Sequence, residues 1–96
     1  MAMELTRDTL VIAKPRLMGA DLGEEIILLH LDKGIYFGLG NVAARIWELL
    51  KRPVRVGDIE QSLLEEYDVE PEKCREELIK LITRLLEEDL AEVQSE

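Results

Sequence analysis

Few residues in this sequence could carry out acid–base or nucleophilic chemistry. Its 96 residues include one histidine, His30, and one cysteine, Cys74. A metal ligand or proton shuttle at His30 would need partners, and Asp32 alone makes neither a metal site nor a catalytic set. A nucleophilic Cys74 would need a nearby base and an electropositive, accessible setting, which its neighbours do not offer. We therefore interpret His30 as an ordinary strand histidine and Cys74 as a small buried hydrophobic residue.

The composition is that of a folded, acidic protein. Hydrophobic residues make up 47% and charged residues 34% of the chain, and the net charge at pH 7 is −9. Because nucleic acids and anionic membrane surfaces attract cationic faces, this charge argues against both as partners. One cysteine excludes an intramolecular disulfide, and no apolar run approaches the roughly 20 residues that span a bilayer. We expect one domain over residues 1–96, structured over about residues 9–93, in the cytoplasm, with no metal and no cofactor.

A stretch rich in glycine and aromatic residues organises the chain. Residues 32–47 hold three of the four aromatic residues and three of the six glycines. Asp32-Lys33-Gly34 predicts a tight turn, since glycine adopts positive φ at little steric cost. Ile35-Tyr36-Phe37 favours a strand, because β-branched and aromatic residues suit a pleated surface. Gly38-Leu39-Gly40 ends that strand, and the apolar spacing becomes helical from Val42 onward.

The strand beginning at Ile35 is predicted to have an open edge. It should pair through a hairpin with the preceding apolar run, Glu25–Leu31. Its other edge stays open unless a later strand covers it, and after residue 40 only Leu90–Val93 resembles a strand. Unpaired edges are usually covered or used, and one use is to accept an extended peptide as an added strand. The same edge could instead pair with a second copy of the chain.

The other elements are predicted from apolar spacing and from helix start and stop signals. A first strand is expected at Thr9–Ala13, and Arg16–Gly23 is expected to be a turn or an irregular bend. Three helices are expected at Asn41–Lys51, Val56–Tyr67 and Pro71–Asp89, the second with Glu60, Glu65 and Glu66 facing water. This order predicts an α+β fold, a winged-helix-like domain with an N-terminal three-stranded antiparallel sheet followed by three helices.

The third predicted helix has an apolar arc of about 160°, wider than one core requires. At 100° per residue, Leu78, Leu81 and Leu85 lie within about 40° of Cys74 and form a core stripe. Farther round, at about 80–140°, lies an apolar shoulder made of Ile79, Ile82 and Leu86. With Arg75 beside it, this shoulder suits the second wall of a groove, and Leu78 at the border serves both. The alternative, equally open, is that the sheet and the first helix simply wrap this helix.

Together these features resemble the PqqD-like family, whose members are also called RiPP recognition elements, for ribosomally made, post-translationally modified peptides. The resemblance covers about residues 9–93 and rests on Asp32-x-Gly34-x-Tyr36-x-Gly38-Leu39, Ala43-Ala44-Arg45-Ile46-Trp47-Glu48-Leu49-Leu50, Asp58-Ile59 and Glu66-Tyr67-Asp68-Val69. Within the family, the sequence is most similar to the stand-alone leader-binding proteins of lasso-peptide clusters. It departs from the family at two helix starts. Gly40 stands where asparagine usually follows the leucine, with Asn41 one place later, and Arg55 stands where a threonine cap is frequent.

This resemblance implies a binder without catalysis. In such domains the leader segment of a precursor peptide pairs as an extra antiparallel strand with the third strand, and its side chains enter a groove against the third helix. The open edge and the apolar shoulder assign the peptide-binding residues as Gly34, Ile35, Tyr36, Phe37, Gly38, Leu39, Arg75, Leu78, Ile79, Ile82 and Leu86. We expect Arg75, with Arg84 or Lys80 as further candidates, to meet an acidic residue of the leader. The implied partners are a cysteine protease that removes the leader and an ATP-dependent macrolactam synthetase.

Two other functions fit the predicted fold. One is a PqqD-type chaperone for another modified-peptide pathway, such as pyrroloquinoline quinone synthesis with a radical SAM enzyme. The other is a winged-helix DNA-binding protein, which fits the element count. The net charge of −9 and the lack of a basic recognition helix oppose that second alternative.

Overall fold

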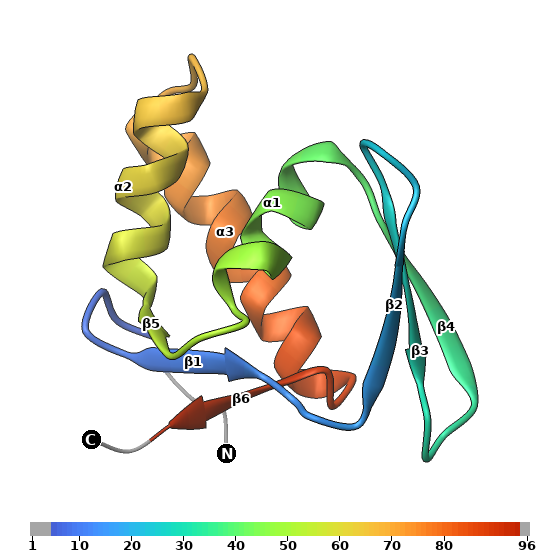
Figure 1. The fold of residues 1–96 in the computed structure, drawn as a ribbon. Helices are drawn as coiled ribbons and strands as arrows, with labels where there is room; N and C mark the ends of the chain where they lie inside the picture. The colour runs from blue at the N-terminus through green and yellow to red at the C-terminus, as the bar shows by residue number, and fades with distance from the viewer. Residues whose placement is uncertain (1–4, 95–96) are drawn as a thin grey trace.

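The computed structural model of this protein describes residues 5–94 (Figure 1). Its elements, in chain order, are β1 (Leu10–Ala13), β2 (Leu17–Asp21), β3 (Ile26–His30), β4 (Ile35–Leu39), α1 (Asn41–Leu49), β5 (Val54–Arg55), α2 (Val56–Glu66), α3 (Pro71–Glu87) and β6 (Ala91–Gln94). All three helices begin at the predicted residue and end within two residues of the predicted end. The predicted strand at Leu90–Val93 is confirmed as β6.

The strands form two separate antiparallel sheets of three strands each among the described residues. In one sheet β1 lies between β5 and β6, and in the other β3 lies between β2 and β4. Helix α1 lies between the β2–β3–β4 sheet and the pair α2 and α3 (Figure 1). The expected α+β fold, with a three-stranded antiparallel sheet preceding the three helices, is confirmed.

The three-stranded sheet that precedes the helices contains β2 in place of the strand predicted at Thr9–Ala13. The strand expected at Thr9–Ala13 exists as β1, but it pairs with β5 and β6. The prediction of a turn or bend over Arg16–Gly23 is wrong, because Leu17–Asp21 forms β2 against β3. Most of β2 is exposed, so its sequence shows no alternation of buried and exposed residues that would mark a strand. Backbone pairing with β3 holds this segment extended.

The hydrophobic core joins the helices to both sheets. Its fully buried side chains include Val11 of β1, Leu28 of β3, Ile59 of α2 and Leu78 of α3. Helix α3 contacts both α2 and β6. The wide apolar arc of α3 therefore packs against α2 and β6, whereas the alternative had placed it against the sheet and the first helix.

A polar network connects the two sheets at the end of α3. The backbone N–H of Lys33 donates to Nδ1 of the buried His30, so the proton of the neutral ring lies on Nε2, 3.0 Å from Oδ2 of Asp89. Nζ of Lys14 lies 3.2 Å from Oδ1 of the same carboxylate. Hydrogen bonds from His30 and Lys14 hold the pKa of Asp89 below its ordinary value. These contacts hold the His30 side chain between β3 and the end of α3.

Asp89 occupies an unusual backbone position for this role. Its φ is +63°, in the left-handed region that favours glycine, directly after α3. The N–H of Leu90 donates to the carbonyl of Leu85 and the N–H of Asp89 to that of Leu86, which is the Schellman pattern at a helix C-terminus. An aspartate in place of glycine here supplies the carboxylate for the network.

Candidate peptide-binding groove

β4 is an edge strand with no partner on its outer side among residues 5–94. It pairs with β3 alone, in a register that runs from His30↔Ile35 to Ile26↔Leu39. Gly34 has a φ of +66° and closes the tight turn before the strand, as the sequence predicted. The open edge predicted from residues 32–40 is confirmed. In an antiparallel edge strand, alternate residues direct both backbone groups outward, where an added strand could pair with them.

The two faces of β4 differ in burial. Side chains alternate across a strand, so Ile35, Phe37 and Leu39 share one face and Tyr36 and Gly38 the other. Phe37 is half-buried and Leu39 is buried, so the face that carries these two side chains is the one toward the core. Tyr36 is 70% exposed and faces solvent.

A cavity of about 320 Å³ lies between β4 and the C-terminal half of α3. The strand side is formed by residues 36–40, and the helix side by Leu81, Arg84 and Leu85. Ala43 at the start of α1 closes it between them. The open backbone edge of β4 therefore runs beside a space that can hold side chains.

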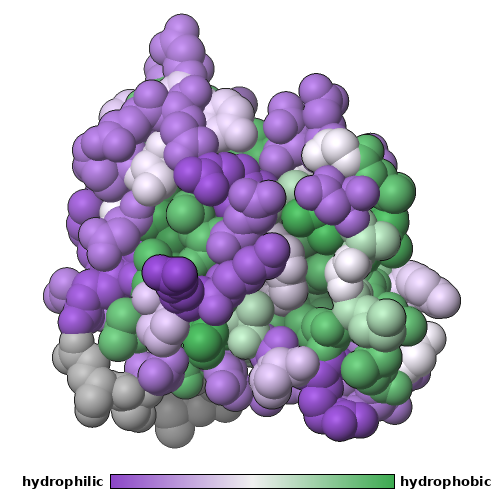
Figure 2. All heavy atoms as spheres, viewed as in Figure 1, coloured by the Kyte–Doolittle hydropathy of each residue, from purple (hydrophilic) through white to green (hydrophobic). Residues whose placement is uncertain are grey.

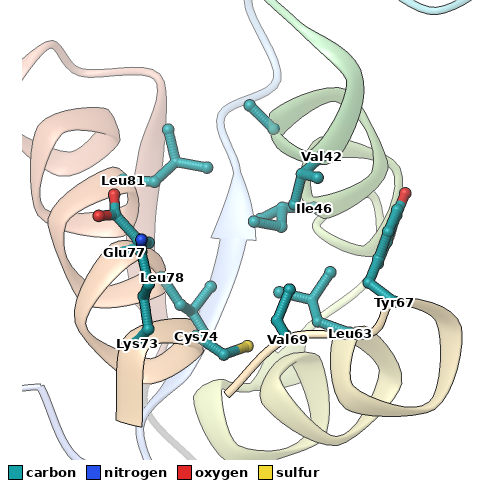
Figure 3. A pocket seen from close by; sticks show the side chains of 11 residues that line it. Val42, Ile46, Leu63, Tyr67, Val69, Lys73, Cys74, Glu77, Leu78 and Leu81 are labelled. Carbon is teal, nitrogen blue, oxygen red and sulfur yellow. The ribbon is translucent and has the colours of Figure 1, made fainter. Parts of the chain in front are cut away.

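A second cavity, of about 430 Å³, lies between α1, the end of α2 and α3, and its lining is almost entirely apolar. In Figure 3, Val42 and Ile46 of α1 lie across this cavity from Leu78 and Leu81 of α3. Further apolar atoms come from Leu63, Tyr67, Val69 and Cys74. This volume is large enough for a bulky apolar side chain.

The two cavities adjoin each other. Ala43 and Leu81 line both of them. We call the combined space the α3 groove; it runs along α3 from β4 to the end of α2. Ala43 and Leu81 therefore lie at the border between the two cavities.

Charged residues lie along the rim of the α3 groove. Arg84 and Glu88 line the cavity beside β4, and Lys73 and Glu77 line the second cavity. Among the described residues, no hydrogen bond or ion pair engages the side chain of Arg84 or Lys73. Both cations are therefore available to an acidic group of a ligand, and Arg84, one of the sequence candidates, lies beside β4.

Arg75 is not placed beside this groove. Its Nε lies 3.1 Å from Oε2 of Glu60 on α2, and the Glu60 side chain, only 3% exposed, also accepts a hydrogen bond from Arg7. The expectation that Glu60 faces water is wrong, and Arg75 lines neither cavity of the α3 groove. Burying a carboxylate is costly without cationic partners, and Arg75 is one of the two that stabilise it.

The burial pattern of α3 also corrects the predicted apolar shoulder. Ile82 is 0% exposed, so the expectation that it is partly exposed is wrong. Ile79 and Leu86 are partly buried against the core, and neither they nor Ile82 line the α3 groove. Leu81, predicted for the core stripe, is only partly buried and lines the groove instead. The flank of α3 that lines the groove thus differs from the apolar shoulder of the sequence prediction.

Of the predicted site residues, Gly34 to Leu39 form the open strand and its turn, and Leu78 forms part of the second cavity. The sequence prediction missed Val42 and Ala43 on α1 and assigned Leu81 to the core. One signal was available. On a helical wheel, Lys73, Glu77, Leu81, Arg84 and Glu88 share one flank of the third helix, a mixed flank typical of a partly exposed groove wall.

The described residues contain no cluster that could hold a metal ion, and their one cysteine is buried. Among residues 5–94, no group of three or more His, Cys, Asp or Glu residues could hold a metal ion. Cys74 is buried, and burial raises the pKa of its thiol, which favours the protonated, unreactive form. No helix in the part of the chain that the structure describes is long and apolar enough to cross a membrane.

The comparisons with known proteins agree with this geometry. The family model of coenzyme PQQ synthesis protein D (PqqD) matches residues 25–91, which include β3, β4 and all three helices. This chain belongs to the PqqD family. The resemblance to PqqD-like RiPP recognition elements is therefore confirmed.

Two solved structures resemble this PqqD-family chain over most of its length. TbiB1 in complex with the TbiA(beta) leader peptide has a TM-score of 0.80 and 30% identity, and the match covers 88% of this chain and 99% of that one. Lasso peptide synthetase B1 complexed with the leader peptide has a TM-score of 0.75 and 28% identity, with 85% and 96% covered. No significant match was found among curated proteins.

Proposed function

We propose that this PqqD-family protein is a RiPP recognition element of lasso-peptide biosynthesis. It binds the leader segment of a ribosomally made precursor peptide, without catalysing a reaction itself, and presents that peptide to the enzymes that process it. The observation that carries this proposal is the open edge of β4 running beside the α3 groove. Two similar solved proteins, both complexes with leader peptides, support it.

The geometry suggests how the leader would lie. A peptide strand antiparallel to β4 runs from the Leu39 end toward Ile35, pairing with the outward backbone groups of the edge. Side chains on its inner face would enter the cavity beside Leu81 and Arg84. The segment that precedes this strand would continue past Ala43, placing an apolar side chain in the second cavity. Backbone pairing would supply affinity, and the two cavities would supply specificity.

The partners that we propose for the bound leader are those implied by the family resemblance. A cysteine protease would cleave the leader, and an ATP-dependent macrolactam synthetase would act on the remaining peptide. All of these steps would occur in the cytoplasm.

A binding experiment tests the proposal. The leader of a precursor peptide encoded beside this chain is labelled with fluorescein and titrated with the protein, and polarisation reports binding. A scrambled peptide of the same composition is the control. Hydrogen exchange on the same complex should show new amide protection in Ile35–Leu39. Equal binding of both peptides, or protection confined to other elements, would contradict the proposal.

A second candidate is a chaperone for coenzyme PQQ synthesis, which the description of the matching family favours. In that role the same edge and groove would hold the precursor of pyrroloquinoline quinone for a radical SAM enzyme. Titration with that precursor peptide, in parallel with the lasso leader, separates the two candidates. The peptide that binds more tightly by at least about tenfold, or about 1.4 kcal/mol, identifies the pathway.

A further inference from the structure

The two walls of the candidate peptide site come from elements that pack against different neighbours. Among the helices and strands of residues 5–94, β4 packs extensively against β3 alone, whereas α3 packs against α2 and β6. The cavity beside β4 lies between these two walls, with residues 36–40 on one side and Leu81, Arg84 and Leu85 on the other. The width of this cavity therefore depends on the contacts that join the β3–β4 hairpin to the end of α3.

One buried side chain makes contacts with both walls. His30 is the last residue of β3 and pairs with Ile35, the first residue of β4. Its Nδ1 accepts a hydrogen bond from the N–H of Lys33, and its carbonyl accepts one from the N–H of Gly34, so His30 fixes the turn that leads into β4. Its Nε2 lies 3.0 Å from Oδ2 of Asp89, just after α3. The imidazole thus joins the hairpin to the end of the helix.

Both oxygens of the Asp89 carboxylate are engaged. Nζ of Lys14 lies 3.2 Å from Oδ1, the oxygen that His30 does not use. The backbone of Asp89 is held as well, because its N–H donates to a carbonyl of the last turn of α3. Glu88 and Leu90, the residues on either side of Asp89, both line the cavity beside β4. A displacement of Asp89 would therefore move the helix-side wall of that cavity.

The His30–Asp89 hydrogen bond lies at a polar end of the sheet. In Figure 2, hydrophobic residues lie over the strands of the β2–β3–β4 sheet, and hydrophilic residues gather at its lower end, where the turn between β3 and β4 lies. Apolar contacts are non-directional, so they leave the spacing of two elements adjustable. A hydrogen bond to a carboxylate is charge-assisted and requires a set distance and direction. His30 is only 3% exposed, so water competes little for this hydrogen bond.

We propose that the His30–Asp89 hydrogen bond sets the spacing between β4 and the C-terminal end of α3, and that His30 and Asp89 are positioning residues of the leader site. This inference rests on the proposed function. A leader strand must pair with the β4 backbone and place its side chains against α3 at the same time, so it binds at one spacing of the two walls. Without the hydrogen bond, the free protein would sample other spacings, and affinity would fall in proportion to the fraction of molecules at the competent one.

Asp89→Gly is the most direct test. Glycine adopts the φ of +63° at little steric cost, so this variant removes the carboxylate and keeps the backbone position after α3. Glu92→Gln is the control with the same change in charge. It removes the other carboxylate beside Lys14, whose Nζ lies 3.3 Å from Oε2 of Glu92, and leaves His30 untouched. We expect leader affinity to fall about tenfold in Asp89→Gly and to stay within about twofold in Glu92→Gln.

Two variants at His30 separate its two side-chain contacts. A glutamine amide can donate from near the position of Nε2, and an asparagine amide oxygen can accept near the position of Nδ1. His30→Gln therefore retains the contact with Asp89, and His30→Asn retains the contact with the turn. We expect His30→Gln to keep leader affinity within about threefold and His30→Asn to lose about tenfold. Urea unfolding identifies the folded variants, and equal affinity of the two would overturn the proposal.

Spin labels measure the spacing in the free protein. Labels attached through Tyr36→Cys and Glu87→Cys, both at exposed positions, report the distance between β4 and α3, and Cys74 is buried away from the label. The distance distribution should broaden in Asp89→Gly and stay narrow in His30→Gln. An unchanged distribution in Asp89→Gly, or normal leader binding by that variant, would overturn this inference alone. Failure of the unmodified protein to bind the leader, with label distances as expected, would overturn the proposed function and the role in leader binding with it.

Discussion

Arg75 of α3 and Glu60 of α2 form an ion pair, with Nε of the arginine 3.1 Å from Oε2 of the buried carboxylate. This pair orients the Arg75 side chain toward α2, and Arg75 lines neither cavity of the α3 groove. The cation beside the open strand is Arg84, which lines the cavity next to β4. We therefore expect the two arginines of α3 to have separable roles, Arg75 in stability and Arg84 in binding.

Arg75→Ala is expected to lower stability and to leave leader binding unchanged. It removes one of two partners of a buried carboxylate, and the loss of a partner to a buried polar group costs about 1–3 kcal/mol. Urea unfolding followed by circular dichroism measures the loss. A several-fold weaker affinity in peptide titrations, with an unchanged unfolding midpoint, would show that Arg75 contributes to leader binding.

Arg84→Ala is expected to show the reverse pattern. Arg84 has no ion-pair partner among the described residues, so its removal should leave the unfolding midpoint unchanged. A partly exposed pair with an acidic leader residue is worth about 0–1 kcal/mol, so affinity should fall by several-fold at most. Titrations at several salt concentrations check the ionic origin, because wild-type affinity should fall with salt and that of Arg84→Ala should not. Parallel salt curves would remove the ionic contact.

Leu81 and Ile82 are adjacent residues of α3, and we expect their truncation to alanine to affect different properties, leader binding for Leu81 and folding stability for Ile82. Ile82 is fully buried, so its truncation should cost about 2–5 kcal/mol of folding stability. Leu81 lines both cavities of the α3 groove, so its truncation should weaken leader binding by about 1–2 kcal/mol and disturb folding less. Thermal melts and peptide titrations on the two variants decide this. If Leu81→Ala unfolds as readily as Ile82→Ala and binds normally, the groove lies elsewhere.

Proline in β4 tests strand addition. Tyr36→Pro and Phe37→Pro each remove one backbone N–H donor. Because successive N–H groups of an edge strand point alternately toward the partner strand and outward, one of these two donors faces β3 and the other faces outward. The proline at the outward position should keep the fold and weaken leader binding by about tenfold, close to the cost of one or two hydrogen bonds. Circular dichroism identifies the folded variant. Tyr36→Ala, which keeps its N–H, is the control, and normal binding by both prolines would exclude pairing at this edge.

Acid is expected to destabilise the protein through the Asp89 network. The pKa of Asp89 is lowered from 3.8 by His30 and Lys14, and that of Asp32 is lowered by Arg16. A carboxyl group whose pKa is lower in the folded than in the unfolded protein stabilises the fold at pH values above its unfolded-state pKa. This stabilisation is lost as the pH falls through the folded-state pKa. Urea midpoints should therefore fall below about pH 4. Asp89→Asn should be less stable at pH 7 and show a shallower fall, whereas curves of equal depth would exclude a role for Asp89.

The sequence predicted the local parts of this fold and missed those that depend on distant partners. The turn at Gly34, the open strand after it and the helix starts at Asn41 and Pro71 follow from residue types a few positions apart. The burial of Glu60 does not, since its partners Arg7 and Arg75 lie 53 and 15 residues away.

Which side of α3 faces the core also could not be predicted from local sequence, and this affected the candidate site. Spacing placed Leu81 in the core stripe and Ile82 on the apolar shoulder, whereas the structure buries Ile82 fully and Leu81 only partly. Packing against α2 and β6 decides that, and neither contact is visible in the periodicity of one helix. The strand β2 was missed because its partner, and not its own pattern, makes it a strand.

In the proposed site, the two cavities that share Ala43 and Leu81 would restrict the length of leader that lies between them. A leader that occupies both cavities must span a fixed path between its strand segment and its apolar anchor. The number of residues between the strand segment and the apolar anchor would then affect affinity as strongly as the residue types do. A leader with suitable residues at the wrong spacing would fill one cavity only, so insertions and deletions should be rejected more strongly than many substitutions.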